Sequence, residues 1–204
     1  MLVDAALRRS LIQSIAETVI EHETELTDLD QAIGDGDHGL NMKRGFGEVL
    51  NKLDEIAPKP LPEALRDVGM TLVMTVGGAS GPLYGTLFMA LGKELGGEPT
   101  KEDLTGAAQS ALKALMARGK SEPGQKTMLD VLAPVIDELA KPEASWDSVR
   151  SAANDAAQAT IPMQATKGRA SFLGERSIGH MDPGARSSQL MIETASSVLE
   201  TAQS

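Results

Sequence analysis

Apolar residues recur along most of this chain at the three- and four-residue spacing of an α-helix. The first such segment covers residues 2–25, and its apolar positions include Leu7, Leu11, Ile15 and Val19. The same spacing, with Pro and capping residues at the boundaries, predicts seven more helices. They cover residues 39–53, 61–76, 81–95, 101–118, 127–140, 145–161 and 183–202. The pattern therefore predicts an all-α fold with eight helices.

Capping residues mark where several of these helices begin. Ser80 is expected to cap the fourth helix, and Thr100 with Asp103 has the pattern of a capping box before the fifth. Ser145 is expected to start the seventh. The best strand candidate, residues 71–76, is rich in β-branched residues but lies inside a helical pattern. We therefore assign it to the third helix.

The size of the chain favours one domain. Its 204 residues are enough to bury about 70% of the surface of the unfolded chain around one sizeable core. A single domain over residues 1–204 is therefore expected. No apolar run reaches the length of about 18 residues that a membrane span needs, and the N-terminal residues do not have the pattern of a signal peptide. We expect no membrane association and a cytoplasmic location.

The composition excludes several classes of function. Cysteine is absent, which excludes disulfide frameworks, Cys-ligated metal sites and Cys nucleophiles. The formal net charge is −10, and the aromatic residues are three Phe, one Tyr and one Trp. Nucleic-acid binding normally needs a basic face and stacking aromatic side chains, so it is not expected.

Glycine clusters in four stretches between the predicted helices, at residues 34–39, 77–81, 119–124 and 168–184. Glycine lets the backbone approach a ligand closely. Loops held by a rigid scaffold are also common positions for functional residues. Four such loops could line one end of a helical bundle.

Three aspartates, Asp30, Asp35 and Asp37, lie within eight residues: Asp35 and Asp37 in the first of these stretches and Asp30 four residues before it. At about 5 Å separation each pair would repel by about 3 kcal/mol at an effective dielectric near 20, which favours a bound cation. Oxygen donors without Cys favour Mg²⁺ or Ca²⁺. An EF-hand is excluded because Phe46 occupies the twelfth position counted from Asp35. The alternative is a solvated acidic turn with Asp as caps.

Two common nucleotide motifs are excluded. Gly34, Gly36 and Gly39 match the dinucleotide fingerprint, but they follow a predicted helix and enclose aspartates that would repel a pyrophosphate. A Walker A motif is absent, because Ala114 stands where the first glycine would have to precede Gly119-Lys120-Ser121. At the other candidate, Gln125 and not glycine precedes Lys126.

Several polar residues near the glycine stretches have two possible roles. His38 either packs locally at a helix start or donates a hydrogen bond to a nucleotide or phosphate. Asn41 could add an oxygen ligand or an amide donor. The stretch beginning at Gly77 could cradle a phosphate or form a tight turn. Asp182 could cap the last helix or accept a hydrogen bond from a nucleotide.

Two further residues suit a nucleotide site. Arg169 suits a phosphate clamp, because guanidinium groups bind phosphate oxygens in a bidentate way. Met128 could pack on a flat base, although a Met at a helix start is more often part of the core. His22, in the first predicted helix, is expected on the helix surface.

Five motifs together resemble those of the nucleotide-binding L subunits of dihydroxyacetone kinases. They occur in the family's order and span most of the chain. They are GDGDHGLNM (34–42), GGASGPLYG (77–85), GQKTMLD (124–130), KGRASFLGERS (167–177) and GHMDPGA (179–185).

The resemblance implies an eight-helix antiparallel barrel with ADP or ATP held at one rim by two Mg²⁺ ions. By matching positions, Asp30, Asp35 and Asp37 would be the metal ligands on which catalysis depends. The nucleotide would be surrounded by His38, Gly39, Leu40, Asn41, Ala79, Ser80, Gly119, Met128, Arg169, Asp182, Pro183 and Gly184. The triose site of the family lies on a separate K subunit, so a partner is expected.

The resemblance also implies a phosphoryl relay. Tightly bound ADP would be rephosphorylated by a phosphohistidine on an M subunit and would pass the phosphate to dihydroxyacetone on the K subunit. One alternative is an ATP-dependent kinase with an exchanging nucleotide, acting on dihydroxyacetone or a carrier-bound fatty acid. Another is an ADP-loaded module that binds a transcription regulator. The sequence does not decide whether the protein forms a homodimer or whether the barrel contains an apolar pocket.

Overall fold

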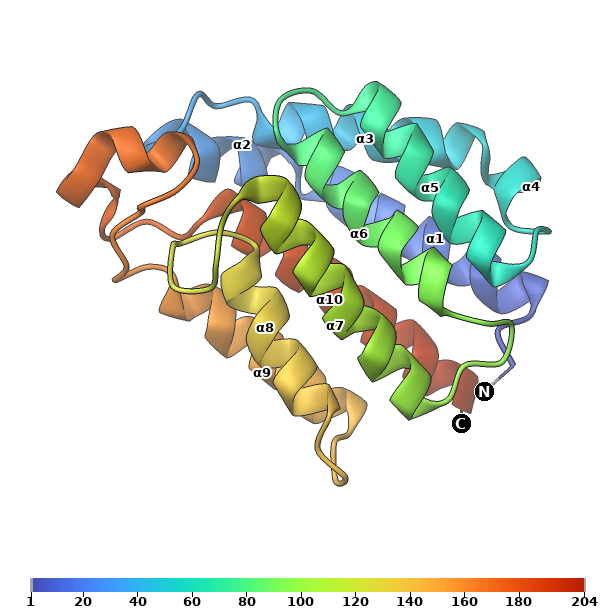
Figure 1. Cartoon of the computed structure of the whole chain (residues 1–204). Helices are drawn as coiled ribbons and strands as arrows, with labels where there is room; N and C mark the ends of the chain where they lie inside the picture. The colour runs from blue at the N-terminus through green and yellow to red at the C-terminus, as the bar shows by residue number, and fades with distance from the viewer. Residues whose placement is uncertain (1, 204) are drawn as a thin grey trace.

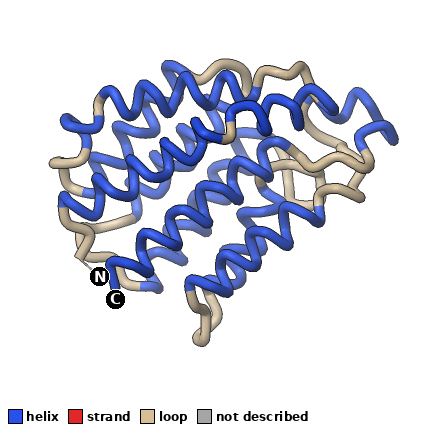
Figure 2. The backbone as a smooth tube through the Cα atoms, turned by 180° about the vertical axis from the view of Figure 1, so that it is seen from behind, coloured by secondary structure: helices blue, strands red, loops and turns tan. Residues whose placement is uncertain are grey.

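Only helices and loops occur in residues 2–203, the part of the chain that the computed structural model describes (Figure 2). The predicted all-α class is confirmed; the ends of the predicted domain, Met1 and Ser204, lie outside these residues. None of the described helices is long and apolar enough to cross a membrane. The helices are α1 (Ala5–Glu21), α2 (Glu23–Ile33), α3 (His38–Asn51), α4 (Leu53–Ile56), α5 (Leu61–Thr75), α6 (Ser80–Glu94), α7 (Lys101–Gly119), α8 (Leu129–Leu139), α9 (Trp146–Ala159), the 3₁₀ segment η1 (Arg169–Ser177) and α10 (Pro183–Gln203).

The long helices contact one another in a cyclic order (Figure 1). α1 packs on α3, α3 on α5, α5 on α6, and so on to α10, which packs back on α1. Residues 2–203 contain ten α-helices rather than the predicted eight. The difference arises because the first predicted helix is broken at His22 and because the one-turn helix α4 follows α3.

The break at His22 separates α1 from α2, the helix that leads to the predicted acidic loop. His22 has φ −92° and ψ 15°, and its Nδ1 donates to the Thr18 carbonyl at 2.7 Å. Beyond the break, α2 continues to Ile33, past the predicted end at residue 25. Asp30 is therefore held by a helix, near its C-terminal end.

Two of the three predicted caps are confirmed. Thr100 and Asp103 form a capping box at α7, and Ser145 forms one with Ser148 at α9. Ser80 does not cap α6: it is the first helical residue, and its Oγ lies 3.0 Å from His38 Nδ1. The predicted cap is absent because the Ser80 hydroxyl bonds instead to His38, which is far away in the sequence.

Glycine allows α5 and α6 to pack closely. A Cβ on Gly69 would lie 2.7 Å from the Gly85 carbonyl oxygen, and a Cβ on Gly85 would lie 2.3 Å from Val73 Cγ2. Such distances leave no room for a side chain at either position. The two backbones can therefore approach each other more closely than larger residues would allow.

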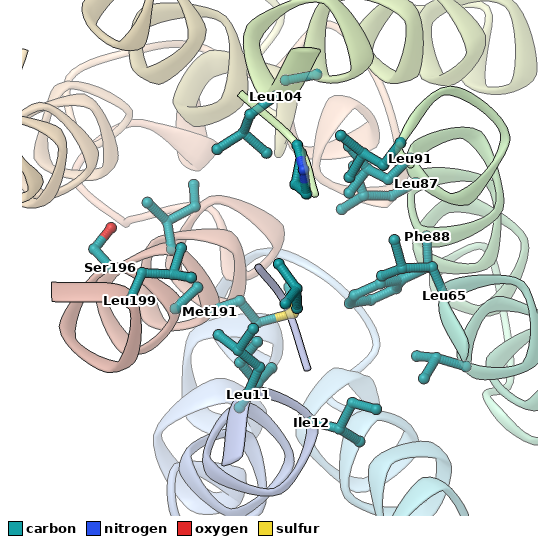
Figure 3. A pocket seen from close by; sticks show the side chains of 18 of the residues that line it. Leu11, Ile12, Leu65, Leu87, Phe88, Leu91, Leu104, Met191, Ser196 and Leu199 are labelled. Carbon is teal, nitrogen blue, oxygen red and sulfur yellow. The ribbon is translucent and has the colours of Figure 1, made fainter. Parts of the chain in front are cut away.

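An apolar cavity of about 300 Å³ lies inside the ring of helices. Side chains of α1, α5, α6 and α10 point into it, among them Leu11, Leu65, Phe88 and Met191 (Figure 3). Its lining also includes Val3 and Leu199, near the two chain ends. The sequence did not decide whether the ring contains such a pocket. The structure has one, and it extends to the end of the ring where the two chain termini lie (Figure 1).

Candidate functional site

Glycine-bearing loops meet at the other end of the ring and enclose a cleft of about 480 Å³. The cleft is lined by the loop after α2, the loop between α5 and α6, and the long connection from α9 to α10 that contains η1. The predicted cluster at 119–124 does not line it; residues 126–128, directly after that cluster, do. Three of the four predicted glycine stretches therefore reach the site.

The three aspartates converge in this cleft. Asp30, Asp35 and Asp37 each offer a carboxylate oxygen, and these oxygens lie within 4.8 Å of one another. Asp30 is buried, and its Oδ2 accepts hydrogen bonds from the backbone N–H groups of Asp37 at 2.8 Å and His38 at 3.1 Å. An all-oxygen set of this kind suits Mg²⁺ or Ca²⁺.

Gly34 leaves the space in which the Asp30 carboxylate lies. A Cβ on Gly34 would lie 2.1 Å from Asp30 Oδ1. We expect Gly34→Ala to displace that carboxylate and to weaken Mg²⁺ binding about 10- to 100-fold, as loss of a ligand's supporting contact typically does. Isothermal titration calorimetry of the nucleotide-free protein measures this affinity.

Gly96→Ala is the matched control for this substitution, because a Cβ on Gly96 would meet nothing within 4 Å. Its Mg²⁺ affinity should equal that of the wild type. An unchanged affinity in Gly34→Ala would mean that the position of the Asp30 carboxylate does not matter for the metal.

Arg169, the predicted phosphate clamp, lies at the mouth of the cleft. Its Nε is 2.9 Å from Asp35 Oδ2, and the two side chains are 69% and 36% exposed. An ion pair this exposed contributes little to stability. A phosphate could therefore draw the guanidinium away from Asp35 at small cost.

A buried hydrogen-bond network joins the first turns of α3, α6 and α10. His38 Nδ1 lies 3.0 Å from Ser80 Oγ, and His38 Nε2 lies 2.9 Å from Ser187 Oγ. Tyr84 OH lies 2.6 Å from the same Ser187 oxygen and 3.1 Å from the Gly184 carbonyl. The network fixes three of the segments that line the cleft.

Burial sets the charge state of this network. It lowers the pKa of His38 to about 4, although Asp30 and Asp37 act in the opposite direction, and it raises the pKa of Tyr84 to about 12. His38 is therefore neutral at pH 7. Both of its ring nitrogens have protein partners, so His38 packs locally here and would have to leave one partner to bind a nucleotide.

Asp182 caps α10. Its Oδ2 accepts from the Ala185 N–H at 2.7 Å, and its own N–H donates to Thr160 Oγ1 at 3.1 Å. Burial raises the pKa of Asp182 to about 7, a shift that Lys126 partly opposes. Of the two predicted roles, the cap is the one visible in the structure.

The raised pKa predicts a pH-dependent effect of Asp182→Asn. The unfolded chain releases this proton near the ordinary pKa of 3.8, whereas the folded chain holds it until about pH 7. Asp182 therefore destabilises the wild type progressively between these values. The amide keeps an acceptor for the cap and does not ionise.

We expect the stability of Asp182→Asn relative to the wild type to rise between about pH 4 and pH 7 and then to level off. Urea denaturation of both ligand-free proteins at several pH values measures the difference. A difference that is constant across this range would show that Asp182 titrates normally.

Most of the predicted nucleotide neighbours line the cleft, and four do not. Those in the lining are His38, Ala79, Ser80, Met128, Arg169, Asp182, Pro183 and Gly184. The four outside it are Gly39, Leu40, Asn41 and Gly119.

Packing explains the positions of these four residues. Gly39 lies against α2, where a Cβ would be 2.0 Å from the Glu23 carbonyl oxygen. Asn41 is buried behind the Gly77 loop and accepts a hydrogen bond from Arg44. Leu40 is 54% exposed at the start of α3, and Gly119 is the last residue of α7. Contact of these residues with a nucleotide stays a prediction.

Sequence reasoning did not single out several residues of the cleft. Tyr84 and Lys167 lie in motifs that the sequence does contain, so their motif membership was an available signal. Lys126 also lines the cleft, although it is only 1% exposed. The sequence around Lys126 does not reveal that its side chain is buried.

Comparison with known proteins identifies relatives that match most of the chain. Residues 32–197 match the model of the DAK2 domain family. The "PEP-dependent dihydroxyacetone kinase 1, ADP-binding subunit DhaL" of Listeria innocua is 48% identical over 189 residues, covering 92% of each chain. The "PEP-dependent dihydroxyacetone kinase, ADP-binding subunit DhaL" of Escherichia coli is 48% identical over 177 residues, covering 82% of this chain and 84% of that protein.

A solved structure has the same fold. The dihydroxyacetone kinase of C. freundii in complex with AMP-PNP and Mg²⁺ matches with a TM-score of 0.78 and 25% identity. The match covers 94% of this chain and 34% of that kinase. This chain therefore spans about a third of the length of that enzyme.

Proposed function

The chain belongs to the DAK2 domain family, and from this premise we propose that it is the ADP-binding subunit of a dihydroxyacetone kinase. The observation that carries the proposal is the convergence of Asp30, Asp35 and Asp37 within 4.8 Å in a cleft made of glycine-bearing loops. Relatives of nearly the same length that are named ADP-binding subunits support it.

In this proposal the three aspartates hold Mg²⁺. Each carboxylate has two oxygens, and with the oxygens of a diphosphate they supply enough ligands for two ions. When bound, Mg²⁺ neutralises phosphate charge and aligns the group to be transferred. The backbone N–H groups that bind Asp30 hold the buried carboxylate in place before any ligand arrives.

The remaining residues of the cleft position the nucleotide. Arg169 is proposed to leave Asp35 and bind a phosphate, and Met128, next to Gly184 in the cleft, is proposed to pack on the base. The network of His38, Ser187 and Tyr84 keeps the first turns of three helices in register. The His38 and Tyr84 side chains of this network do not change charge near pH 7.

A relay through the nucleotide is proposed, in which ADP is rephosphorylated in place by a phosphohistidine subunit and serves a dihydroxyacetone-binding subunit. Among the described residues of the cleft, His38 is the one histidine, and both of its ring nitrogens are bonded within the protein. This chain thus offers no free imidazole there to carry a phosphoryl group. The designation of both relatives as PEP-dependent further supports the relay.

Nucleotide content tests the proposal. The protein is purified, dialysed extensively in Mg²⁺ buffer and denatured, and the released nucleotide is identified by ion-exchange chromatography. ADP near one per chain is expected for a retained cofactor. An empty protein that binds ATP reversibly would favour an exchanging kinase, and a protein that binds neither nucleotide would overturn both functions.

A further inference from the structure

Lys126 is a buried cation at the wall of the cleft. It lies in the connection between α7 and α8, and the residue is 1% exposed. Its Nζ donates to the Met163 carbonyl at 3.0 Å and to the Ser177 carbonyl at 2.5 Å. These two acceptors belong to the connection that runs from α9 to α10, so the lysine joins two separate walls of the site.

The backbone at Lys126 is held in an uncommon conformation. Its φ is 62°, in the left-handed region that favours glycine. For a residue other than Gly or Asn this conformation costs free energy, and it persists only where the surrounding structure holds it. The surrounding structure therefore holds the backbone of Lys126 in a strained conformation, in which its long side chain reaches both carbonyls.

The charge of Lys126 is not balanced by a bonded carboxylate. Within residues 2–203, no ion pair of Lys126 with Asp or Glu occurs within 4 Å. Asp182 acts on it at longer range, but burial raises the pKa of Asp182 itself to about 7. An ammonium donates up to three hydrogen bonds, and two are used.

Joining two carbonyls does not by itself require a positive charge. Burial disfavours the charged form and lowers the pKa of Lys126. A buried charge without a partner is costly, and a neutral donor could join the same two carbonyls. The cleft next to Lys126 is where the proposed ligand, a polyanion, would lie.

We propose that Lys126 is a fixed countercharge for the diphosphate of the bound nucleotide. This inference rests on the proposed function. A charge held rigidly and away from water acts more strongly on phosphate than a mobile surface charge, because less solvent screens it and no reorganisation is needed on binding. Lys126 thus complements Arg169, whose side chain is exposed and paired with Asp35.

Lys126→Met tests the inference, because Met removes the charge and keeps a side chain of similar length. With Mg²⁺ present, we expect ADP to bind about tenfold or more weakly than to the wild type, the effect of one partly buried charge pair. Binding of adenosine, which lacks the phosphates, should change less than about twofold. Calorimetry with ADP and with adenosine measures both affinities.

Lys120→Met is the matched control. Lys120 lies in the same connection, also has a left-handed φ (48°), is exposed and does not line the cleft. Its loss changes the net charge equally, so ADP affinity should stay within about twofold of the wild type. Lys126→Arg, which keeps the charge, should retain most of the ADP affinity.

Three outcomes would overturn the inference. The first is equal ADP affinity in Lys126→Met and the wild type. The second is an equal loss of ADP and adenosine binding, which indicates a purely structural role. The third is failure of both Lys126→Met and Lys126→Gln to fold, judged by circular dichroism, because folding alone would then require the lysine. A wild type that binds no ADP would instead overturn the proposed function.

Discussion

Asp30→Asn is expected to abolish Mg²⁺-dependent ADP binding and, with it, phosphoryl transfer to dihydroxyacetone in the presence of the partner subunits. Asp30 is the buried member of the three aspartates, and its carboxylate is fixed by two backbone N–H groups. The amide oxygen of Asn can still accept those hydrogen bonds, so the loop should keep its shape. The substitution then removes mainly the negative charge.

The expected loss of ADP affinity exceeds about 100-fold, since loss of a mere supporting partner of a metal ligand already costs about 10- to 100-fold. Calorimetry with ADP in Mg²⁺ buffer measures it, and the same titration in EDTA should show little difference between variant and wild type. The EDTA titration separates the metal-dependent part of binding from the rest.

Asp28→Asn is the matched control, because Asp28 is exposed on the same helix and loses the same charge. It should bind ADP and Mg²⁺ like the wild type. If Asp30→Asn also bound ADP normally, Asp30 would be only an acceptor that shapes the loop, and the assignment of the three aspartates as metal ligands would fail.

Gly39→Ala is expected to lower the free energy of unfolding by about 3 kcal/mol, the upper part of the usual range for overpacking. A Cβ at this position would lie 2.0 Å from the Glu23 carbonyl oxygen and 2.8 Å from the Thr27 backbone nitrogen. Both are backbone atoms of α2, which cannot move aside as a flexible side chain could. α2 and α3 would have to separate.

Urea denaturation of the ligand-free protein measures this loss, and Gly47→Ala is the control on the same helix. A Cβ on Gly47 would meet nothing within 4 Å. Alanine should therefore stabilise α3 there by about 0.5–1 kcal/mol through its better helix propensity. Equal stability changes in the two variants would contradict the close packing of α2 on α3 at Gly39.

Gly39 also shows that the residues of one motif can have different roles. The resemblance to the L subunits places Gly39 beside the nucleotide, whereas the packing places it against α2, outside the lining of the cleft. Its neighbours Asp37 and His38 do line the cleft. Successive residues at a helix start point in different directions, so one short motif can serve both the ligand and the core.

Features that depend on residues close together in the chain were predictable. Apolar spacing predicted most of the helices, although not the break at His22, and the capping boxes at Thr100 and Ser145 needed only residues three positions apart. The aspartates lie within eight residues on one helix end and one glycine-rich loop. A short loop leaves them little freedom to separate, so their convergence followed from the sequence.

Features that depend on contacts between distant residues were decided by the tertiary structure. The hydroxyl of Ser80 bonds to His38, 42 residues away, instead of capping its own helix. Lys126 reaches carbonyls 37 and 51 residues away, and its sequence neighbours do not indicate them. Which distant residues become hydrogen-bond partners depends on how the helices pack around the ring. Local spacing thus determined the helices and the acidic loop, whereas packing determined which side chains are buried, bonded and turned toward the cleft.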